Sequence, residues 1–586
     1  MDPWAWAGLS LALVASAFAA WSARRGALHP AVSALALAAL CLRVPPAAHF
    51  GLSPWDERYH ALVAKNALDD FWVPKLVAEP LAEPAPDDWK HSHVWLHKPP
   101  GMTWLIAGSY ALFGVNEGAL RLPSVLLSSG FVLLVFAIAR RFATPQAALL
   151  AAALAAWHAR LLLLVAGERA TDHVDVGMTC ATALGVLCAL RAAESANDSP
   201  RRFAARVALV GVTTALAWYV KETPALIVPA LLAAALRARS AGWRTTFAST
   251  GGALAVAALL VLPWLLYTAH AFPELAAFAR GRGARYFLHV VDGQGGPWWF
   301  HLANLPLDFG WAAPLALGWL ALESLRRREL RPLAAWAALV YGVFSLAATK
   351  MQSYVLIAAP AVLAAVGWLV LDALPRRLRP VALVLVAANA LWSVTGVEEP
   401  WQQKARDPLW AAELRRLGSA LEQELPAQKR LLFVPDSPLE CMFYVRATCL
   451  AERATPERVT AARAAGFAVA SYGDPALPGV THIPFDPAAE PARRLARALK
   501  AAKSPEVLVF HAREPEDLGA YLRRTLKHAE ASADWPRASR KLARKLEHGA
   551  LLVVLLPPGA PAPPQLHGDF PDALFLEDAR YARPLD

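Results

Sequence analysis

Two adjacent carboxylates could do acid–base chemistry at a membrane surface. Asp56 and Glu57 lie in the stretch GLSPWDERYHALVAKN, a few residues after a long apolar segment. Charge that close to a bilayer is costly, and ionisable residues in such places are commonly functional. A carboxylate here could accept a proton from a hydroxyl group. The alternative is that the pair only caps the amphipathic helix that follows, because acidic residues suit a first helical turn.

Other ionisable and polar residues recur beside the ends of later apolar segments. They are His97 and Lys98 in LHKPPG, Asp172, His173 and Asp175 in ERATDHVDVG, Lys221 and Glu222 in YVKETP, His289 and Asp292 in YFLHVVDGQGGPWW, and Lys350 and Tyr354 in TKMQSYVLIAAP. Lysines and histidines can stabilise the negative charge of a departing phosphate. Carboxylates combined with such cations suit the transfer of a group from a lipid phosphate to a hydroxyl or amine acceptor.

Each of these residues also has a simpler role open to it. Lys98 can extend to lipid headgroups, and Tyr354 can be an interfacial aromatic residue. Lys221 and Glu222 can form a local ion pair. Asp172 or Asp175 can be a solvated turn residue, and a single histidine such as His289 is more often structural. One common site is favoured because all these residues are expected on the same side of the membrane.

The elements that must position these residues are membrane helices. Of the 586 residues, 56% are hydrophobic and 18% are charged, whereas a soluble domain carries about 25% charged residues. Segments long enough to cross a bilayer number about twelve: 4–22, 29–45, 121–141, 146–165, 174–193, 203–219, 223–238, 247–268, 303–323, 332–349, 354–373 and 378–396. The shorter segment 101–115 is predicted to be re-entrant or interfacial. The first segment lacks a basic flank, so we expect a retained helix rather than a cleaved signal peptide.

Arginines predict the orientation of these helices. Arginine clusters occupy alternate links, at 24–25, 140–141, 201–202, 237–244, 326–331 and 376–379. All six links share one side if segment 101–115 does not cross, and the positive-inside rule makes that side cytoplasmic. Both termini, the loop 46–120 and the polar residues above are then outside. The net charge of +11 is explained by topology, and nucleic acid is not an expected partner.

The tail after residue 396 has a different composition. Apolar runs at 431–434, 467–471, 506–510 and 550–556 alternate with polar helical stretches such as 489–502, a pattern typical of a small α/β domain. The stretch PPGAPAPPQ near its end predicts an extended linker or cover. Cys441 and Cys449 lie in this tail and could pair in an oxidising compartment, but their spacing alone leaves that open.

The order of these motifs resembles the GT-C glycosyltransferases, specifically the bacterial relatives of protein O-mannosyltransferases and of the lipid A aminoarabinose transferase. The matching motifs are DE in WDERYHALVAKNALDDFWVPKL, KP in HKPPGMTWLIAGSYALFG followed by NEGALRLPSVL, an Asp at the outer start of a later span, the VKETP turn, and KMQSYVLIAAP. The resemblance covers about 29–396. Residues 1–396 are then a transmembrane catalytic domain, and 397–586 are an extracytoplasmic α/β domain.

The resemblance also implies residue roles. The catalytic residues would be Asp56 as the base, Glu57 as its support, and Asp175 or Asp172 on the acceptor side. The residues that bind the donor phosphate would be Lys98, His97, Lys350, Tyr354, His289 and Lys221. No cofactor is implied with certainty, and a divalent metal ion is left open with His97 and His289 as candidate ligands. Two departures stand out: His97 replaces a glutamate of the aminoarabinose transferase, and 281–297 lacks that enzyme's clear basic-aromatic pattern.

The implied reaction is a single displacement with inversion. A sugar on polyprenyl phosphate would pass to a hydroxyl of a lipid, glycan or protein acceptor at the outer face of a bacterial inner membrane, with the active site and tail in the periplasm. A lipid-linked donor explains why no nucleotide-binding loop is found. The rival functions are a polyprenyl-lipid transporter or flippase, which would place charges near the bilayer midplane, and another outer-leaflet glycan ligase, which would lack DE followed by KP.

Overall fold

The computed structural model describes residues 3–81, 88–397, 408–425, 429–434, 437–472 and 477–484, and the strands at 507–511, 530–532, 551–556 and 574–577. The chain divides into two compact units, Met1–Gln403 and Lys404–Asp586. The predicted helix 489–502 and the stretch PPGAPAPPQ lie outside the described residues. Each unit is described by itself below.

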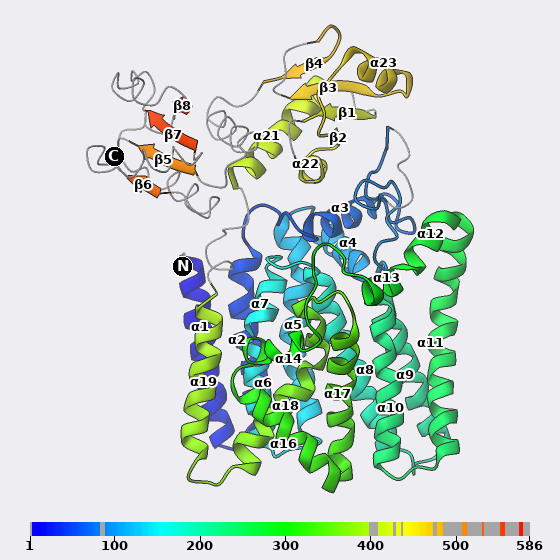
Figure 1. Ribbon diagram of the computed structural model, residues 1–586, viewed down its shortest axis with the longest axis vertical. Coiled ribbons are helices and arrows are strands. Elements are labelled where there is room, and N and C mark those ends of the chain that lie inside the picture. Colours follow the sequence, from blue (N-terminus) through cyan, green and yellow to red (C-terminus); the bar gives the residue numbers. More distant parts are fainter. Residues whose placement is uncertain are drawn as a thin grey trace. The chain divides into compact units, whose positions relative to one another are not determined.

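The first unit is a bundle of helices (Figure 1). In chain order they are α1 (Pro3–Arg24), α2 (Leu28–Ala47), α3 (Glu57–Asn66), α4 (Gly101–Phe113), α5 (Glu117–Ala139), α6 (Pro145–Ala156), α7 (Ala159–Val165), α8 (Asp172–Glu194), α9 (Pro200–Lys221), η1 (Thr223–Leu226), α10 (Ile227–Ala238), α11 (Trp243–Ala271), α12 (Pro273–Arg280), α13 (Arg282–Leu288), α14 (Phe300–Ala303), α15 (Leu305–Phe309), α16 (Ala312–Arg326), η2 (Arg328–Leu330), α17 (Arg331–Leu346), η3 (Gln352–Ala358), α18 (Ala359–Trp368), η4 (Leu369–Ala373) and α19 (Arg379–Thr395). All twelve predicted apolar segments contain helix.

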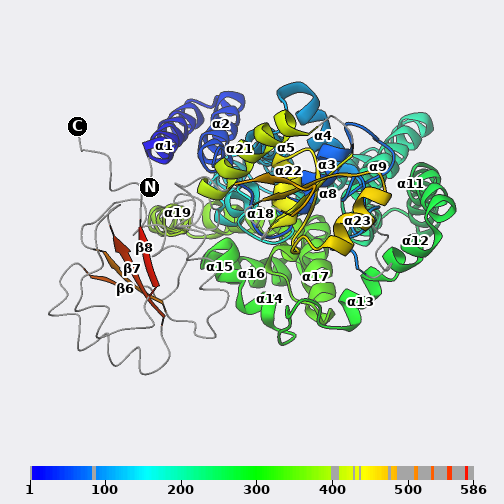
Figure 2. The same cartoon turned by 90° about the horizontal axis from the view of Figure 1, so that it is seen from above.

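Length and composition qualify seven of the described helices as membrane spans, or eight if α6 and α7, which bend by 41°, form one span. The count of twelve therefore stays a prediction. Viewed from above in Figure 2, α8 and α18 lie inside the bundle, while α1 and α11 lie at opposite edges. Burial agrees, because 83% of the apolar window of α8 is buried inside the structure, against 28% for α11. The helix that carries Asp172 and Asp175 is thus among the best-enclosed elements of the unit.

Local sequence explains where several helices begin and end. The Asn116 side chain accepts a hydrogen bond from the Ala119 N–H at 2.9 Å and so caps α5. Gly114 ends α4 with φ 77°, and this 13-residue helix is too short to cross a bilayer alone, as predicted for 101–115. The predicted segment 303–323 is wrong at its start, because the chain breaks at Gly310 (φ 86°) and α16 begins only at Ala312. A side chain at Gly310 would collide with Asn389 of α19.

The arginine-rich links meet at one end of the bundle. Glu194, the last residue of α8, pairs with Arg141 at 3.1 Å and with Arg239 at 3.7 Å. Arg328 donates to Ser240 at 3.4 Å. The links that follow α5, α8, α10 and α16 therefore lie together, as the charge pattern predicts. The helices α3 and α4 lie at the opposite end (Figure 1).

A buried arginine stabilises the break between α6 and α7. Arg43 of α2 is 1% exposed, and its guanidinium donates to the carbonyl oxygens of Ala155 and Ala156, both at 3.1 Å. The last carbonyls of any helix lack partners within that helix. Arg43 supplies those partners in the apolar interior, where water is scarce.

A second buried cation fixes the loop between α2 and α3. The Arg121 side chain of α5 binds both carboxylate oxygens of Glu57, at 2.6 and 3.0 Å, and neither side chain has any exposed surface. Arg121 also donates to the carbonyls of Ala47, His49 and Gly51, and the Ser53 N–H donates to Glu57 at 2.6 Å. The chain from α2 to α3 is thereby held against α5.

The second unit contains two four-stranded parallel sheets. The first has the order β2 (Thr448–Leu450), β1 (Arg430–Phe433), β3 (Ala468–Tyr472), β4 (Thr481–Ile483), with helices α21 (Pro408–Glu424), α22 (Pro438–Tyr444) and α23 (Pro456–Ala464). The second has the order β6 (Glu530–Ser532), β5 (Val507–His511), β7 (Leu551–Leu556), β8 (Leu574–Glu577). The four predicted apolar runs all coincide with strands. Cys441 and Cys449 are both buried, and the structure contains no disulfide between them.

Replacing Glu57 with Gln should destabilise the membrane unit by about 3–5 kcal/mol, because Arg121 would keep its buried charge without a carboxylate. The measurement is thermal unfolding of the detergent-purified protein. Glu452→Gln is the control, since Glu452 forms an exposed pair with Arg458 and should change stability by less than about 1 kcal/mol. Equal losses in both variants would contradict the anchoring role of the Glu57–Arg121 pair.

Candidate active site

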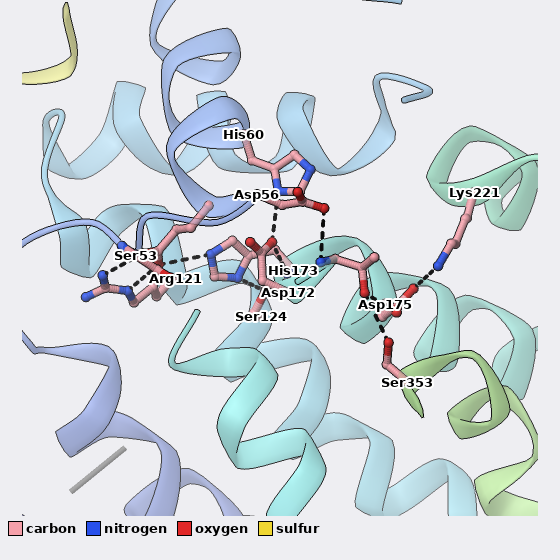
Figure 3. A network of polar contacts seen from close by, with 12 residues as sticks. Ser53, Asp56, His60, Arg121, Ser124, Asp172, His173, Asp175, Lys221 and Ser353 are labelled. Atoms are coloured by element: carbon pink, nitrogen blue, oxygen red, sulfur yellow. Dashed lines mark hydrogen bonds and ion pairs between the residues drawn. The ribbon is translucent and has the colours of Figure 1, made fainter. Parts of the chain in front are cut away.

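Asp56 lies immediately before α3, at the end of the bundle that carries α3 and α4 (Figure 1). Its side chain makes no capping hydrogen bond to α3. Instead, its Oδ2 accepts a hydrogen bond from the Thr171 N–H at 3.0 Å (Figure 3). Thr171 has φ 71°, a left-handed conformation that is costly for a β-branched residue. The interpretation of Asp56 as a mere helix cap is therefore wrong.

Asp175 joins three turns of the chain. Its carboxylate accepts hydrogen bonds from Thr171 Oγ1 and from Lys221 Nζ, and Thr171 Oγ1 lies 3.1 Å from Ser353 Oγ. Lys221 also lies over the Tyr354 ring, 4.5 Å from its centre. The starts of α8 and η3 and the end of α9 thus meet at one polar network (Figure 3).

The alternative of a local Lys221–Glu222 pair is wrong. Glu222 instead pairs with Arg282 of α13 at 2.8 Å. Glu222 lies between α9 and η1, and its backbone has φ 47° there. This pair attaches α13 to the turn that follows α9.

Asp172 is buried and paired, not a solvated turn residue. Its Oδ1 lies 2.8 Å from Nδ1 of His60 on α3, and both side chains have no exposed surface. Burial disfavours the imidazolium form of His60, but the Asp172 carboxylate outweighs that effect, and the pKa of His60 is raised above its ordinary value. The neighbouring His173 contacts Ser124 of α5 at 2.9 Å and Glu57 at 3.4 Å. The start of α8 is therefore joined to both α3 and α5.

A cavity of about 760 Å³ opens beside these networks. Its polar lining comprises Lys98, Lys221, Glu222, Thr223, Arg280, Arg282, Tyr286 and Tyr354. Its apolar lining comes largely from α10, α13 and α17, with Leu226, Ile227, Ala230, Phe287, Leu288, Leu339, Val343 and Phe344. One cavity thus combines a cationic region with a wall of aliphatic and aromatic side chains.

Lys98 shares the electrostatic environment of the carboxylates. Burial lowers the pKa of Lys98 below the ordinary lysine value, while Asp56 raises it and the nearby charges of Lys221 and Arg282 lower it further. Lys98 also lines the cavity, so its ammonium can face a phosphate there while it interacts electrostatically with Asp56 and Asp175.

The predicted phosphate ligands do not all reach this cavity. Lys98, Lys221 and Tyr354 line it. Lys350 does not, because its Nζ donates to the carbonyls of Phe344, Ser345 and Ala347 and caps α17. His289 is exposed and is not among the residues that line the cavity. The roles predicted for these last two residues are therefore not supported by their positions.

His97 lies in a neighbouring cleft and not in a metal cluster. Its ring stacks on Trp89, with centres 3.9 Å apart and an interplanar angle of 10°, and it lines a small cleft with Phe278, Arg282 and Arg285. Burial, helped by Lys98 and Arg282, lowers the pKa of His97 well below its ordinary value. Within the described ranges, no group of three or more His, Cys, Asp or Glu side chains could hold a metal ion. The side chains present do not form the metal site that the sequence left open.

Sequence reasoning missed several residues of the site. The sequence predicts no site residue between 281 and 288, because 281–297 lacks the clear basic-aromatic pattern of the aminoarabinose transferase, but Arg282 and Tyr286 line the cavity, as does Arg280 just before the stretch. The pattern RGRGARYF was detectable, since it begins at Arg280, one residue before that stretch. His60 and Thr171 carried no comparable signal, because their roles depend on contacts with residues more than a hundred positions away.

Comparisons with known proteins find similar sequences and similar folds. Residues 97–267 match the family model described as dolichyl-phosphate-mannose-protein mannosyltransferase. An undecaprenyl phosphate-alpha-4-amino-4-deoxy-L-arabinose arabinosyl transferase from Pseudomonas aeruginosa is 30% identical over 280 residues, 46% of this chain and 49% of that protein. The corresponding enzyme from Pseudomonas paraeruginosa is 27% identical over 52% of this chain and 55% of its own length. The chain spans about half the length of the curated relatives it matches.

Solved structures share the fold. ArnT from Cupriavidus metallidurans bound to undecaprenyl phosphate superposes with a TM-score of 0.53 and 17% identity, over 74% of this chain and 87% of that one. The archaeal oligosaccharyltransferase AglB from Archaeoglobus fulgidus superposes with a TM-score of 0.51 and 13% identity, over 72% of this chain and 64% of that one. At these identities the likeness concerns the fold alone. Residues 97–267 thus match the dolichyl-phosphate-mannose-protein mannosyltransferase family, and the chain is similar in sequence to bacterial arabinosyl transferases and in fold to ArnT and AglB.

Proposed function

We propose that this protein is a membrane glycosyltransferase that moves a sugar from a polyprenyl-phosphate donor to an acceptor hydroxyl, with inversion at the anomeric carbon. The single observation that carries the proposal is the composition of the 760 Å³ cavity. A polyprenyl phosphate has an anionic head and a long apolar chain. The cavity offers cations for the first and aliphatic side chains for the second, close to the carboxylate of Asp56.

The donor phosphate is assigned to the cationic part of the cavity. Arg282 presents a guanidinium whose planar donors suit phosphate oxygens, and Lys98 adds a second positive charge. The prenyl chain is assigned to the apolar side chains of α10 and α17, where it displaces water from Ile227, Leu339 and Val343. Several relatives are named for an undecaprenyl phosphate donor, which makes undecaprenyl phosphate our first choice.

Asp56 is assigned the role of general base. The Thr171 N–H holds one of its oxygens, which orients the other for a hydroxyl group. As Asp56 takes the acceptor proton, the acceptor oxygen bonds to the anomeric carbon, and the carbon–oxygen bond to phosphate breaks with its electron pair leaving on polyprenyl phosphate. Asp175 and Lys221 hold the surrounding turns together. Inversion follows because attack and departure occur on opposite faces of the carbon.

Two further assignments follow from topology. The positive-inside rule makes the arginine-rich end cytoplasmic, so the active site and the second unit are assigned to the periplasmic side of an inner membrane. The acceptor is a hydroxyl of a lipid, glycan or protein. The rival function as a transporter has less support, because transporters bind substrate near the bilayer midplane, whereas Asp56, Lys98 and Lys221 lie at one end of the helices.

Asp56→Asn should retain donor binding and lose transfer by at least about 100-fold, because a general base contributes roughly 10²–10⁴-fold to rate. The measurement supplies radiolabelled polyprenyl-phosphate sugars to membranes and follows label into polyprenyl-free products. Asp69→Asn, at an exposed carboxylate of the same outer loop, is the control and should transfer normally. Native rates in Asp56→Asn would reject Asp56 as the base.

Lys98→Gln and Arg282→Gln should each weaken binding of undecaprenyl phosphate by about 10–100-fold, since a hydrogen bond to a charged group contributes roughly 1.5–3 kcal/mol.

The pKa of Lys98 is lowered, so its ammonium should lose its proton at an alkaline pH below the ordinary lysine range. The affinity of the native protein for undecaprenyl phosphate should fall at that pH. The Lys98→Gln variant should lack that fall. Lys90→Gln, at an exposed lysine, should bind like the native protein, and equal affinity in all variants would place the donor elsewhere.

A further inference from the structure

His60 is held in one orientation by a carboxylate that does not face the cavity. Its Nδ1 lies 2.8 Å from Asp172 Oδ1, and neither side chain has exposed surface. Asp172 Oδ1 also accepts from the His173 N–H. A carboxylate at Nδ1 selects the tautomer with the proton on that nitrogen, which leaves the lone pair of the neutral imidazole on Nε2.

The other ring nitrogen of His60 has no hydrogen-bond partner among the described residues. Buried polar atoms in folded proteins nearly always have one, so such an atom calls for an explanation. Two charged groups besides Asp172 act on His60: Asp56 favours its charged form and Lys98 opposes it. His97 also interacts electrostatically with His60. The Trp95 ring packs edge-on against the His60 ring, with ring centres 5.8 Å apart. Asp56 and His60 are drawn together in Figure 3.

We propose that His60, positioned by Asp172, accepts at Nε2 the proton that Asp56 removes from the acceptor. The inference rests on the proposed function and adds a second proton-carrying residue to it. The O–H bond of the Asp56 carboxylic acid breaks, its electron pair stays on Asp56, and the proton bonds to the lone pair of Nε2. The result is an imidazolium paired with Asp172 and a regenerated Asp56 carboxylate. When product leaves, the imidazolium returns the proton to the partly exposed Asp56, which releases it to water.

The direction of this transfer follows from basicity. A carboxylic acid gives its proton readily to an imidazole, and the pKa of His60 is raised further because the Asp172 carboxylate outweighs the effect of burial. Lys98 cannot take the proton while it is an ammonium ion. His60 is also inaccessible to water in this structure, so a proton that reaches it cannot arrive directly from bulk solvent.

The test compares pH profiles of sugar transfer by the full-length protein in native form and as His60→Gln and Asp172→Asn. In the native protein, turnover should fall as pH drops through the pKa of His60, since a protonated imidazole accepts nothing. Asp172→Asn should move this acid limb to lower pH, because the residue that favours the imidazolium has lost its charge. His60→Gln should lose the limb and lower kcat by about 10-fold or more, with the KM for donor within about 2-fold of native.

A matched pair provides the control. His91 and Asp88 form a similar contact, 2.9 Å long, on the exposed surface of the same loop, so His91→Gln and Asp88→Asn should leave both kcat and the profile unchanged. Thermal unfolding checks that each variant is folded, and if His60→Gln fails to fold, the shift in Asp172→Asn decides. An unchanged acid limb in Asp172→Asn, or native kcat in folded His60→Gln, would overturn the inference. Absence of transfer by the native protein would instead refute the proposed function.

Discussion

The ion pair between Glu57 and Arg121 is the interaction on which the candidate site depends. A buried charge without a partner is among the most costly features of a protein interior, and here both charges have no exposed surface. Arg121 uses its remaining donors on carbonyls between α2 and α3, so this loop has few alternative conformations. Asp56 precedes Glu57 directly and has its place set by the same anchor. Glu57 thus fixes the backbone of this loop, while Asp56 remains the candidate base.

The second constraint is the pairing of charges around the cavity. Asp175 is paired with Lys221, Glu222 with Arg282, and Asp172 with His60. Each pair joins two different elements, so the polar residues hold neighbouring ends of α3, α8, α9 and α13 together. Lys98 takes part in none of the ion pairs found among the described residues. A cation left available in this way, next to an apolar wall, is what an amphipathic anion requires.

Sequence reasoning could predict apolar helices and candidate site residues because both have local signals. Apolar length predicts a membrane segment, and carboxylates or lysines beside such segments are unusual enough to be noticed, as with Asp56 and Lys98. It could not separate Lys350 from Lys98, because a lysine after an apolar segment can equally bind a phosphate or cap a helix. That choice depends on where the last carbonyls of α17 lie, which only the folded chain determines. The same holds for Glu57, whose partner is 64 residues away.

Arg43 has a consequence for how the chain is assembled in the bilayer. An arginine inside a membrane helix is costly unless its charge is compensated, and the compensating carbonyls of Arg43 belong to α6, 113 residues later in the chain for Ala156. Until α6 has been made, the Arg43 guanidinium lacks these carbonyl partners. The final packing of α2 therefore depends on a segment that is synthesised much later than α2 itself.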